Sequence, residues 1–328
     1  MNSFGRIFRI QLFGESHGPY VGVTIDGCPA GLALTVDDFE DDLSRRRSGA
    51  AGTTDRQEPD VPEIISGWHN GRTTGAPLTL LFANKDVDST DYEPFRAIPR
   101  PGHADFAASK KWQGYNDLRG GGYLSGRLTV ALVAAGVIAK KLIAPINVYA
   151  NLIMAGGSYD IQEAVEAAVK EGDSIGGLIE CCAQGVPCGW GEPFFDSVES
   201  LLSHLLFSIP GVKGVEFGAG FDAAEMRGSE YNDAIISPAG KTKENNAGGI
   251  IGGITNGNDL LLTVALRPAA SIKKIQKAFD LTTEKELGFQ LSGRHDSCFA
   301  LRAPVIVEAA VAIVLADLSF LPIIAPSQ

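Results

Sequence analysis

Two histidines stand in short polar segments whose neighbours could bring them against a ligand. Residues 14–18 read Gly-Glu-Ser-His-Gly, so flanking glycines would present Ser16 and His17 from a turn. Residues 99–105 read Pro-Arg-Pro-Gly-His-Ala-Asp and place His103 in a rigid loop between an arginine and an acidic residue. Because an imidazole titrates near neutral pH, both are candidate proton donors or acceptors. The alternative for each is a structural, hydrogen-bonded histidine.

A third segment, residues 293–296, places Arg294, His295 and Asp296 side by side. A cation, an imidazole and a carboxylate in this arrangement can hold an anion and move a proton. The same arginine and aspartate could instead form a structural ion pair. We expect this segment to lie just before a helix that begins near Pro304, because proline suits the first turn of a helix.

A glycine-rich run from Gly120 to Gly122 precedes Ser125 and an apolar stretch that begins at Thr129. Backbone N–H groups at a helix N-terminus bind phosphate readily, so this run is a candidate anion site. Its spacing fits neither a P-loop nor a dinucleotide-binding fingerprint. ATP is therefore not an expected ligand.

The net charge of −11 argues against a nucleic-acid or anionic-membrane surface, since both need a broad excess of lysine and arginine. An anionic ligand would therefore need a local basic pocket. Nine arginines could supply it: Arg45, Arg46, Arg47, Arg56, Arg100, Arg119, Arg127, Arg294 and Arg302. The first three could instead be solvated charges at the end of a helix.

Five cysteines without regular spacing indicate reduced thiols, and the three cysteines near Cys181 have no neighbouring histidine that would suggest zinc. No metal site is predicted.

The N-terminus lacks the pattern of a secretory signal, so we expect a cytoplasmic protein. The apolar stretch 303–321 contains Glu308 and Asp317, which favours a buried core helix over a membrane span.

Apolar periodicity predicts the elements that must position these segments. Alternating residues favour strands around 8–12, 21–25, 78–82 and 178–183, the first two forming an antiparallel pair. Apolar patterns favour helices over 129–143, 161–169 and 197–209, and a further helix has Thr35 as its N-cap and three arginines in its last turn. The dipeptide Asn256-Gly257 favours a tight hairpin between strands at 250–255 and 260–266.

A weak internal repeat suggests two similar halves. Residues 27–31 and 185–189 each combine glycines with a proline and a cysteine after a predicted strand. Two sheet-plus-helix halves around shared apolar helices would explain this repeat and the two unusually apolar segments. No linker separates the halves, so we expect one α+β domain over residues 1–328.

The motifs, taken in order, resemble the chorismate synthase family from end to end. They are the His17 segment, the triple arginine, and residues 99–105, 119–129, 248–257 and 293–296. The resemblance implies two antiparallel sheets that enclose central helices with internal pseudo-symmetry, in a homotetramer whose subunits share their pockets. It also implies a lyase that removes phosphate and the C6 proton from 5-enolpyruvylshikimate 3-phosphate (EPSP) by 1,4-elimination. The product is chorismate, the last step of the shikimate pathway, and reduced FMN is used without net redox change.

The resemblance also implies roles for individual residues. His17 would protonate the departing phosphate, and His103 would protonate the reduced flavin. Asp296, with Ser16 and Ser125, would manage the proton at flavin N5 while the flavin itself acts as the base.

Binding residues follow from the same position matching. Arg46 would approach a nucleotide or the phosphorylated substrate. Arg100 and Arg127 are added from electrostatics, because charge-assisted contacts suit the carboxylates and phosphate of EPSP. FMN would contact Tyr123, Leu124, Ser125, Pro210, Gly211, Gly252, Arg267, Pro268, Ala269, Ala270, Ser271 and Arg294.

The chain departs from the family where residues 123–129 read Tyr-Leu-Ser-Gly-Arg-Leu-Thr in place of the commonest Arg-Ser-Ser-Ala-Arg-Glu-Thr. One alternative is therefore a flavin-binding relative without catalysis. A second is a histidine phosphatase that uses residues 294–296, although the usual Arg-His-Gly order is absent. The sequence also leaves open whether this chain reduces its flavin with NADPH or depends on a separate flavin reductase.

Overall fold

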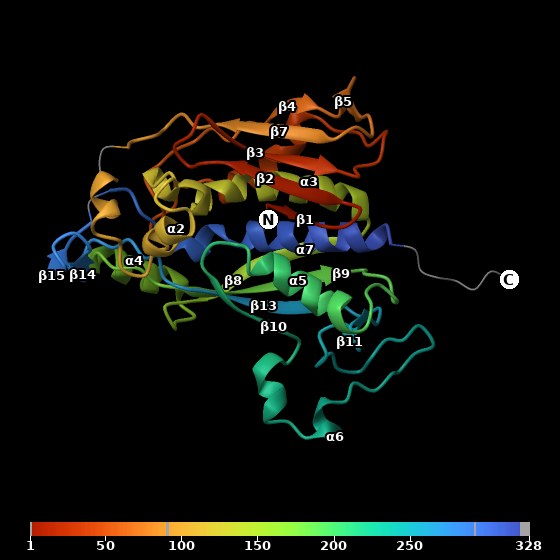
Figure 1. Ribbon diagram of the computed structural model, residues 1–328. Coiled ribbons are helices and arrows are strands. Elements are labelled where there is room, and N and C mark those ends of the chain that lie inside the picture. The colour runs from red at the N-terminus through yellow and green to blue at the C-terminus, as the bar shows by residue number, and fades with distance from the viewer. Residues whose placement is uncertain (1, 90–91, 292, 322–328) are drawn as a thin grey trace.

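Two antiparallel sheets form the outer layers of the computed structural model, which describes residues 2–89, 92–291 and 293–321 (Figure 1). The first sheet contains, in spatial order, β1 (Ser3–Phe4), β2 (Arg9–Gly14), β3 (Tyr20–Asp26), β7 (Leu78–Ala83) and β4 (Glu63–Ser66). The second contains β10 (Val212–Phe217), β13 (Leu260–Leu266), β9 (Gly177–Gln184) and β8 (Asn147–Ala155). Burial alternates along β7 and β13, so one face of each sheet is turned towards the interior.

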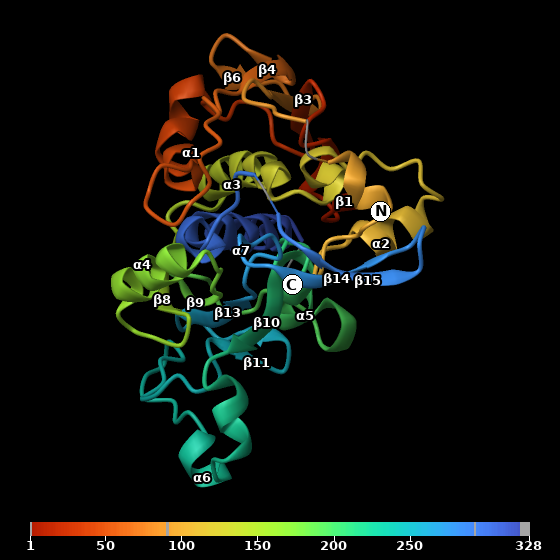
Figure 2. The same cartoon turned by 90° about the vertical axis from the view of Figure 1, so that its left-hand side faces the viewer.

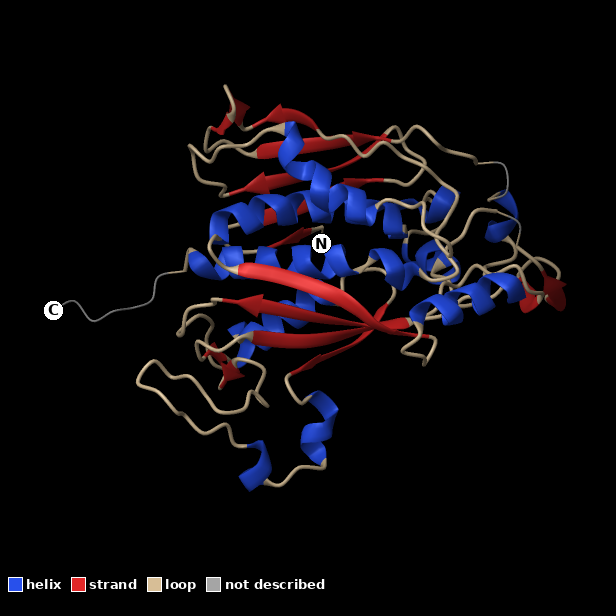
Figure 3. Ribbon diagram, turned by 180° about the vertical axis from the view of Figure 1, so that it is seen from behind, coloured by secondary structure: helices blue, strands red, loops and turns tan. Residues whose placement is uncertain are grey.

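Helices α3 (Thr129–Ile143) and α7 (Pro304–Ser319) lie side by side between the sheets (Figure 1). Figure 3, seen from behind, shows the same layers. Both helices are apolar around almost their whole circumference, as helices packed on all sides must be. Their buried side chains and those of both sheets belong to one hydrophobic cluster.

The two acidic residues of α7 have partners in the interior. Glu308 pairs with Arg45 and Lys140. Asp317 accepts the backbone N–H groups of residues 6–8 and so holds the N-terminal segment against the helix. Because a buried carboxylate is stable only with such partners, both are compatible with a core position. The predicted buried helix is confirmed, and no helix within the described residues is long and apolar enough to cross a membrane.

Shorter elements surround these layers. The 3₁₀ turn η1 (Val36–Phe39), capped by Thr35 as predicted, leads into α1 (Glu40–Arg46). The other helices are α2 (Asp105–Lys111), α4 (Ile161–Glu171), α5 (Val198–Leu206) and α6 (Gly228–Tyr231). The other 3₁₀ turns are η2 (Glu93–Arg96), η3 (Arg119–Leu124), η4 (Gly126–Leu128), η5 (Phe194–Asp196), η6 (Gly220–Ala224) and η7 (Phe299–Arg302). Short strand pairs are β5 (Trp68–His69) with β6 (Arg72–Thr73), β11 (Ile250–Ile251) with β12 (Ile254–Thr255), and β14 (Gln276–Asp280) with β15 (Lys285–Phe289). Figure 2 shows that the segment containing α6 extends away from the layers.

The α+β class and most predicted elements are confirmed. The strands predicted around 8–12, 21–25, 78–82, 178–183 and 260–266 correspond to β2, β3, β7, β9 and β13, and β2 pairs antiparallel with β3. The predicted helices over 129–143, 161–169 and 197–209 correspond to α3, α4 and α5. Local apolar periodicity was sufficient for these elements because each buries one regular face or a whole surface.

The predicted hairpin at Asn256-Gly257 is wrong. The tight turn lies at Gly252 and Gly253, between β11 and β12. Both glycines have positive φ, which only glycine adopts without strain, so they serve a tight turn better than the asparagine-glycine pair that follows. β13 instead pairs with β9 and β10, where its alternating apolar side chains are buried.

α3 and α7 pack closely at Gly136. A Cβ atom at this position would lie 2.3 Å from the Cβ of Ala309, nearer than two carbon atoms can approach. The small residues therefore set the distance between the central helices.

We expect Gly136→Ala to lower the free energy of unfolding by about 1–3 kcal/mol, the usual cost of overpacking a core. Gly228→Ala is a matched control, because the nearest atom to its added Cβ would be 4.0 Å away. Urea unfolding followed by circular dichroism measures both variants. Equal stability of Gly136→Ala and Gly228→Ala would show that the helix contact is not tight.

Candidate active site

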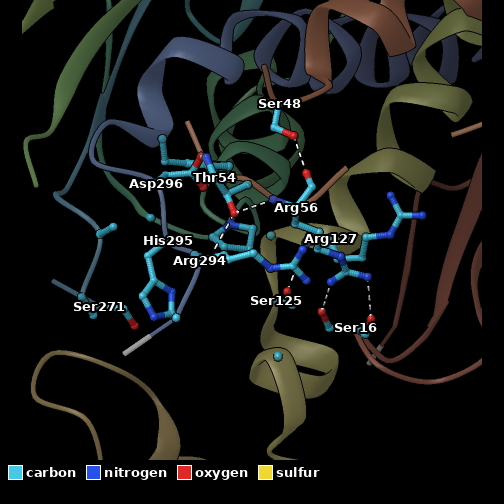
Figure 4. Close-up of a pocket in the computed structure, with 18 of the residues that line it drawn as sticks. Ser16, Ser48, Thr54, Arg56, Ser125, Arg127, Ser271, Arg294, His295 and Asp296 are labelled. Carbon is cyan, nitrogen blue, oxygen red and sulfur yellow. Dashed lines mark hydrogen bonds between the residues drawn. The ribbon is translucent and has the colours of Figure 1, made fainter. Parts of the chain in front are cut away.

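A cavity of about 510 Å³ lies where α3 and α7 begin. Figure 4 shows part of its lining. This volume suits a small organic ligand. Eight arginines and four acidic residues line the cavity, which therefore carries excess positive charge in a chain of net charge −11. The arginines are Arg46, Arg47, Arg56, Arg100, Arg127, Arg267, Arg294 and Arg302.

Both central helices turn their N-terminal ends towards this cavity. Residues 124–127, close to the start of α3, and Phe299 and Arg302, close to the start of α7, belong to its lining. Arg46 connects the two helix starts, because its guanidinium donates to Thr129 Oγ1 at 3.3 Å and its carbonyl accepts from Arg302 at 3.3 Å. The positive ends of two helix dipoles therefore add to the arginine charge, and together they favour anionic ligands.

His17 lies in the turn after β2, and its ring is held on three sides. Nδ1 is 2.9 Å from Ser89 Oγ, and the ring meets that of Tyr92 edge to face at 5.2 Å. A Cβ atom on Gly120 would lie 2.5 Å from Nε2, so this edge packs against the glycine loop. Burial, followed by the cations of Arg56 and Arg119, lowers the pKa of His17. The imidazole is therefore neutral at pH 7 in the free protein.

Three glycines carry the chain between the two histidines. Gly120, Gly121 and Gly122 have φ values of 60°, 82° and 55°. A Cβ atom on Gly121 would lie 3.7 Å from His103 Nε2, as the one on Gly120 would meet His17. The Nε2 atoms of His17 and His103 therefore face neighbouring glycines of the same loop.

His103 is held by a buried carboxylate. Its Nδ1 lies 2.7 Å from Asp105 Oδ1, and Asp105 also accepts two hydrogen bonds from Arg100 at 2.7 and 2.8 Å. Burial opposes ionisation of Asp105, but the hydrogen bonds from Arg100 and His103 outweigh it and keep the pKa of that carboxyl below its usual range. Arg100 Nη2 also lies 3.1 Å from Nδ1, so both groups hold this edge of the ring and leave Nε2 towards the glycine loop.

One buried carboxylate holds two predicted ligand-binding arginines. Asp60 accepts from Arg46 at 2.7 Å and also from Arg127. Burial lowers the pKa of Arg46 to about 10 although Asp60 opposes the shift, so the guanidinium stays charged at pH 7. Arg46 is thus part of the site, and the alternative of a solvated helix-end charge does not apply to it.

Asp296 connects the segment before α7 to the loop that follows α1. Its Oδ1 accepts the N–H of Thr54 at 2.9 Å, and its Oδ2 accepts from Arg302 at 2.7 Å. Arg294 instead contacts both carboxylate oxygens of Asp86 at 2.8 Å. The structural pair between Arg294 and Asp296 that the sequence left open is therefore not formed (Figure 4).

The structure brings nearly all predicted site residues to this cavity: Ser16, His17, Arg46, Arg100, His103, Leu124, Ser125, Arg127, Pro210, Gly211, Arg267, Pro268, Ala269, Ala270, Ser271, Arg294 and Asp296. Two lie elsewhere. Tyr123 lines a neighbouring cavity of about 530 Å³ that shares His103 and Leu124 with the first. Gly252 lies in the turn between β11 and β12, outside the lining of its own chain's cavity.

Sequence reasoning missed three polar residues that organise the site. Glu58 binds Arg56 at 2.7 Å, and Arg56 donates to Ser16 Oγ at 2.9 Å (Figure 4). The acidic residues Glu58 and Asp60 follow Arg56 closely in the sequence, a signal that could have marked both. Ser89 contacts His17 from a distant part of the chain and has no local signal. Within the described residues, no group of three histidine, cysteine or acidic side chains could hold a metal ion.

A family model for chorismate synthase matches residues 8–320. The chain belongs to the chorismate synthase family. A chorismate synthase of Chitinophaga pinensis is 56% identical over 322 residues, which cover 98% of this chain and 97% of the relative. One of Dehalococcoides mccartyi is 45% identical and covers 97% of this chain and 96% of the relative. A crystal structure of chorismate synthase matches with a TM-score of 0.74 at 26% identity, covering 96% of this chain and 92% of that one. The family consists of lyases, and the function of this chain is the last step of the shikimate pathway.

We expect NMR titration of free protein to give His17 a pKa below 6.5, because burial and nearby cations disfavour the imidazolium. His17 is then neutral above that pKa and gains its proton only as the pH falls through it. Saturating inorganic phosphate should raise this pKa, since an anion stabilises the imidazolium. Arg56→Gln should also raise it by removing a cation. His204, exposed on α5, is the internal control. A His17 pKa that responds to neither change would contradict this electrostatic account.

Proposed function

We propose that this chain binds EPSP beside reduced FMN in the arginine-lined cavity and eliminates phosphate and the C6 proton to give chorismate. The observation that carries the proposal is that His17 and His103 lie beside the same glycine loop and line a cavity with eight arginines. EPSP brings two carboxylates and a phosphate. Only a concentrated positive pocket can bind such a ligand on a chain that is acidic overall.

Arg100 and Arg127 are the proposed substrate ligands, together with Arg46. Each is buried and held from behind by a carboxylate, Asp105 for Arg100 and Asp60 for the other two. These pairs fix the guanidinium groups before the substrate arrives, so little side-chain entropy is lost on binding. Arg46 can also approach the phosphate of a nucleotide, because it lies at the start of α3.

FMN fits the wall formed by residues 210–211 and 267–271. Gly211, Ala269 and Ala270 give this wall small side chains, which leave room for a planar ring system. Leu124, Ser125 and Arg294 complete the proposed contacts within one chain, and Tyr123 stands beside them. Because Gly252 lies outside its own cavity, we assign it to the cavity of a neighbouring subunit. When bound, reduced FMN supplies an electron-rich partner that assists loss of the allylic phosphate and the C6 hydrogen without net redox change.

His17 is the proposed proton donor to the departing phosphate. At rest its imidazole is neutral because burial and three cations lower its pKa. An anionic substrate offsets those cations, so the ring takes up a proton as EPSP binds. The N–H bond of the imidazolium then breaks as an O–H bond forms on the leaving phosphate.

His103 and Asp296 are the other proposed proton-handling residues. Asp105 Oδ1 lies 2.7 Å from His103 Nδ1 and orients the ring, so that its Nε2 would be the atom that passes a proton to a bound reduced flavin. Asp296, with Ser16 and Ser125, handles the proton at flavin N5. Each Asp296 oxygen accepts one hydrogen bond and keeps a second lone pair on which a proton can be received.

The proposed fold is the pseudo-symmetric sandwich of the family in one domain over residues 1–328. Strand order supports it. The spatial order β2-β3-β7-β4 in the first sheet corresponds strand for strand to β8-β9-β13-β10 in the second, as the repeat predicted from the sequence would require. We further propose a cytoplasmic homotetramer. The exposed rings of Phe194 and Phe195 support subunit contacts. NADPH is the proposed reductant, used by this chain or by a separate flavin reductase.

We expect anaerobic turnover of EPSP with chemically reduced FMN, and none with oxidised FMN or without flavin. A 1,4-elimination must break a weakly acidic C–H bond, and acid–base residues alone provide too little assistance. Chorismate formation followed by absorbance measures the three reactions. Equal rates in all of them would exclude the proposed mechanism, whereas many turnovers for each reduced FMN would support it.

We expect His17→Ala and His103→Ala each to lower kcat by about 10²–10⁴-fold, the usual contribution of a general acid or base. The control is His204→Ala, at an exposed position on α5. Circular dichroism and titration of reduced FMN should be unchanged in all three variants. Near-normal kcat in both site variants would show that these histidines do not carry the proton transfers.

A further inference from the structure

We propose, on the basis of the function above, that Ser89 is a positioning residue for His17. Its hydroxyl oxygen accepts a hydrogen bond from Nδ1 of His17 and leaves Nε2 as the nitrogen that exchanges a proton with phosphate. The two atoms, Oγ and Nδ1, are 2.9 Å apart, although the residues are 72 positions apart in the sequence. None of the segments that suggested catalysis contains Ser89.

The segment 84–89 begins on the turn that contains His17. The side-chain amide of Asn84 donates to the carbonyls of Glu15 and Gly18 at 3.1 and 2.7 Å. The backbone N–H of Asn84 donates to the carbonyl of Pro19 at 3.0 Å. The segment therefore leaves β7 already fixed against the residues on either side of His17.

Glu58 fixes the next part of the segment. This carboxylate is buried and accepts the backbone N–H groups of Lys85 and Asp86 at 2.9 and 3.3 Å. It also binds Arg56, which donates to Ser16 Oγ, the neighbour of His17. One carboxylate thus positions both the chain that leads to Ser89 and a cation of the cavity.

The position of Nε2, on the ring edge opposite Ser89, determines which tautomer of His17 Ser89 must stabilise. Nε2 packs against Gly120, and Gly120 belongs to the cavity lining. In the imidazolium both nitrogens carry protons, so Ser89 must accept from Nδ1 in the acting state. When the Nε2–H bond breaks and the O–H bond of phosphate forms, the Nδ1–H bond to Ser89 is retained. Ser89 therefore selects the tautomer whose Nε2 is ready for the next proton.

Charged groups near His17 come from several segments and act independently of Ser89. Arg56 follows α1, Arg119 begins the glycine loop and Arg294 precedes α7, and all three disfavour the imidazolium. Asp117 favours it. Because Ser89 is uncharged, its replacement by alanine removes the hydrogen bond without changing this field.

Kinetics of Ser89→Ala, Ser89→Thr and the exposed control Ser229→Ala test the proposal under anaerobic conditions with EPSP and reduced FMN. We expect Ser89→Ala to lower kcat by about 10-fold to 100-fold, as loss of an orienting partner does for metal-bound histidines. KM should stay near that of the parent, because no substrate contact is lost. The limb of the kcat profile that reports protonated His17 should move to lower pH, since the imidazolium loses an acceptor. Ser89→Thr should recover most of kcat.

Imidazole ¹⁵N chemical shifts give a second readout that needs no flavin or substrate, in a chain with only five histidines. Neutral His17 should carry its proton on Nδ1 in the parent protein and should populate both tautomers in Ser89→Ala.

Unchanged shifts would overturn the proposal even if kcat falls, and so would an unchanged kcat. Should Ser89→Ala fail to fold, Ser89→Cys tests the same bond through a weaker acceptor. If the parent protein does not turn over EPSP, the proposed function fails, while the ¹⁵N comparison still decides the role of Ser89.

Discussion

The close parallel packing of α3 and α7 is the constraint on which the site depends. Gly136 and Ala309 let the helices touch, and both helices then start at the same end of the molecule. Parallel helices align their dipoles, an arrangement that is unfavourable unless charge of the opposite sign meets the ends. Lys140 and Lys141 lie in the last turn of α3. Anions bound in the cavity would provide the complementary charge at the N-terminal ends. The parallel packing of the two helices therefore favours an anionic ligand at this end.

A second consequence concerns the arginines, which repel one another unless carboxylates separate them. Asp60 stands between Arg46 and Arg127, and Asp105 holds Arg100. Compensation is partial, since Arg46 and Arg127 share the single carboxylate of Asp60. Removing these charges from water costs free energy that the carboxylates offset only in part. The remaining positive charge is what a ligand with two carboxylates and a phosphate can neutralise.

Local signals were sufficient to predict the central helices and the turns that contain His17, His103 and Asp296, because each depends on apolar periodicity or on neighbouring residues. The hairpin at Asn256-Gly257 was predicted wrongly, since the pairing of β13 is decided by burial against distant strands. Ser89 was missed for the same reason. Its contact with His17 exists only after β7 has joined the first sheet and brought the following segment to the turn. Functional contacts between distant segments are set by the fold, and a single sequence gives no direct sign of them.

The departure at residues 123–129 can now be placed in space. Tyr123 turns to the neighbouring cavity and donates to the carbonyl of Leu12 at 3.4 Å, while Leu124 stands at the boundary of the two cavities. The change therefore alters side chains at the edge of the proposed flavin wall and leaves the glycine loop beside the two histidines intact. Ser125, whose hydroxyl accepts from the N–H of Arg127, still begins the turn before α3. Buried carboxylates stand behind Arg46, Arg100 and His103, and removing such charges from water costs free energy that a bound anionic ligand can offset. Their presence favours an active enzyme over the scaffold alternative.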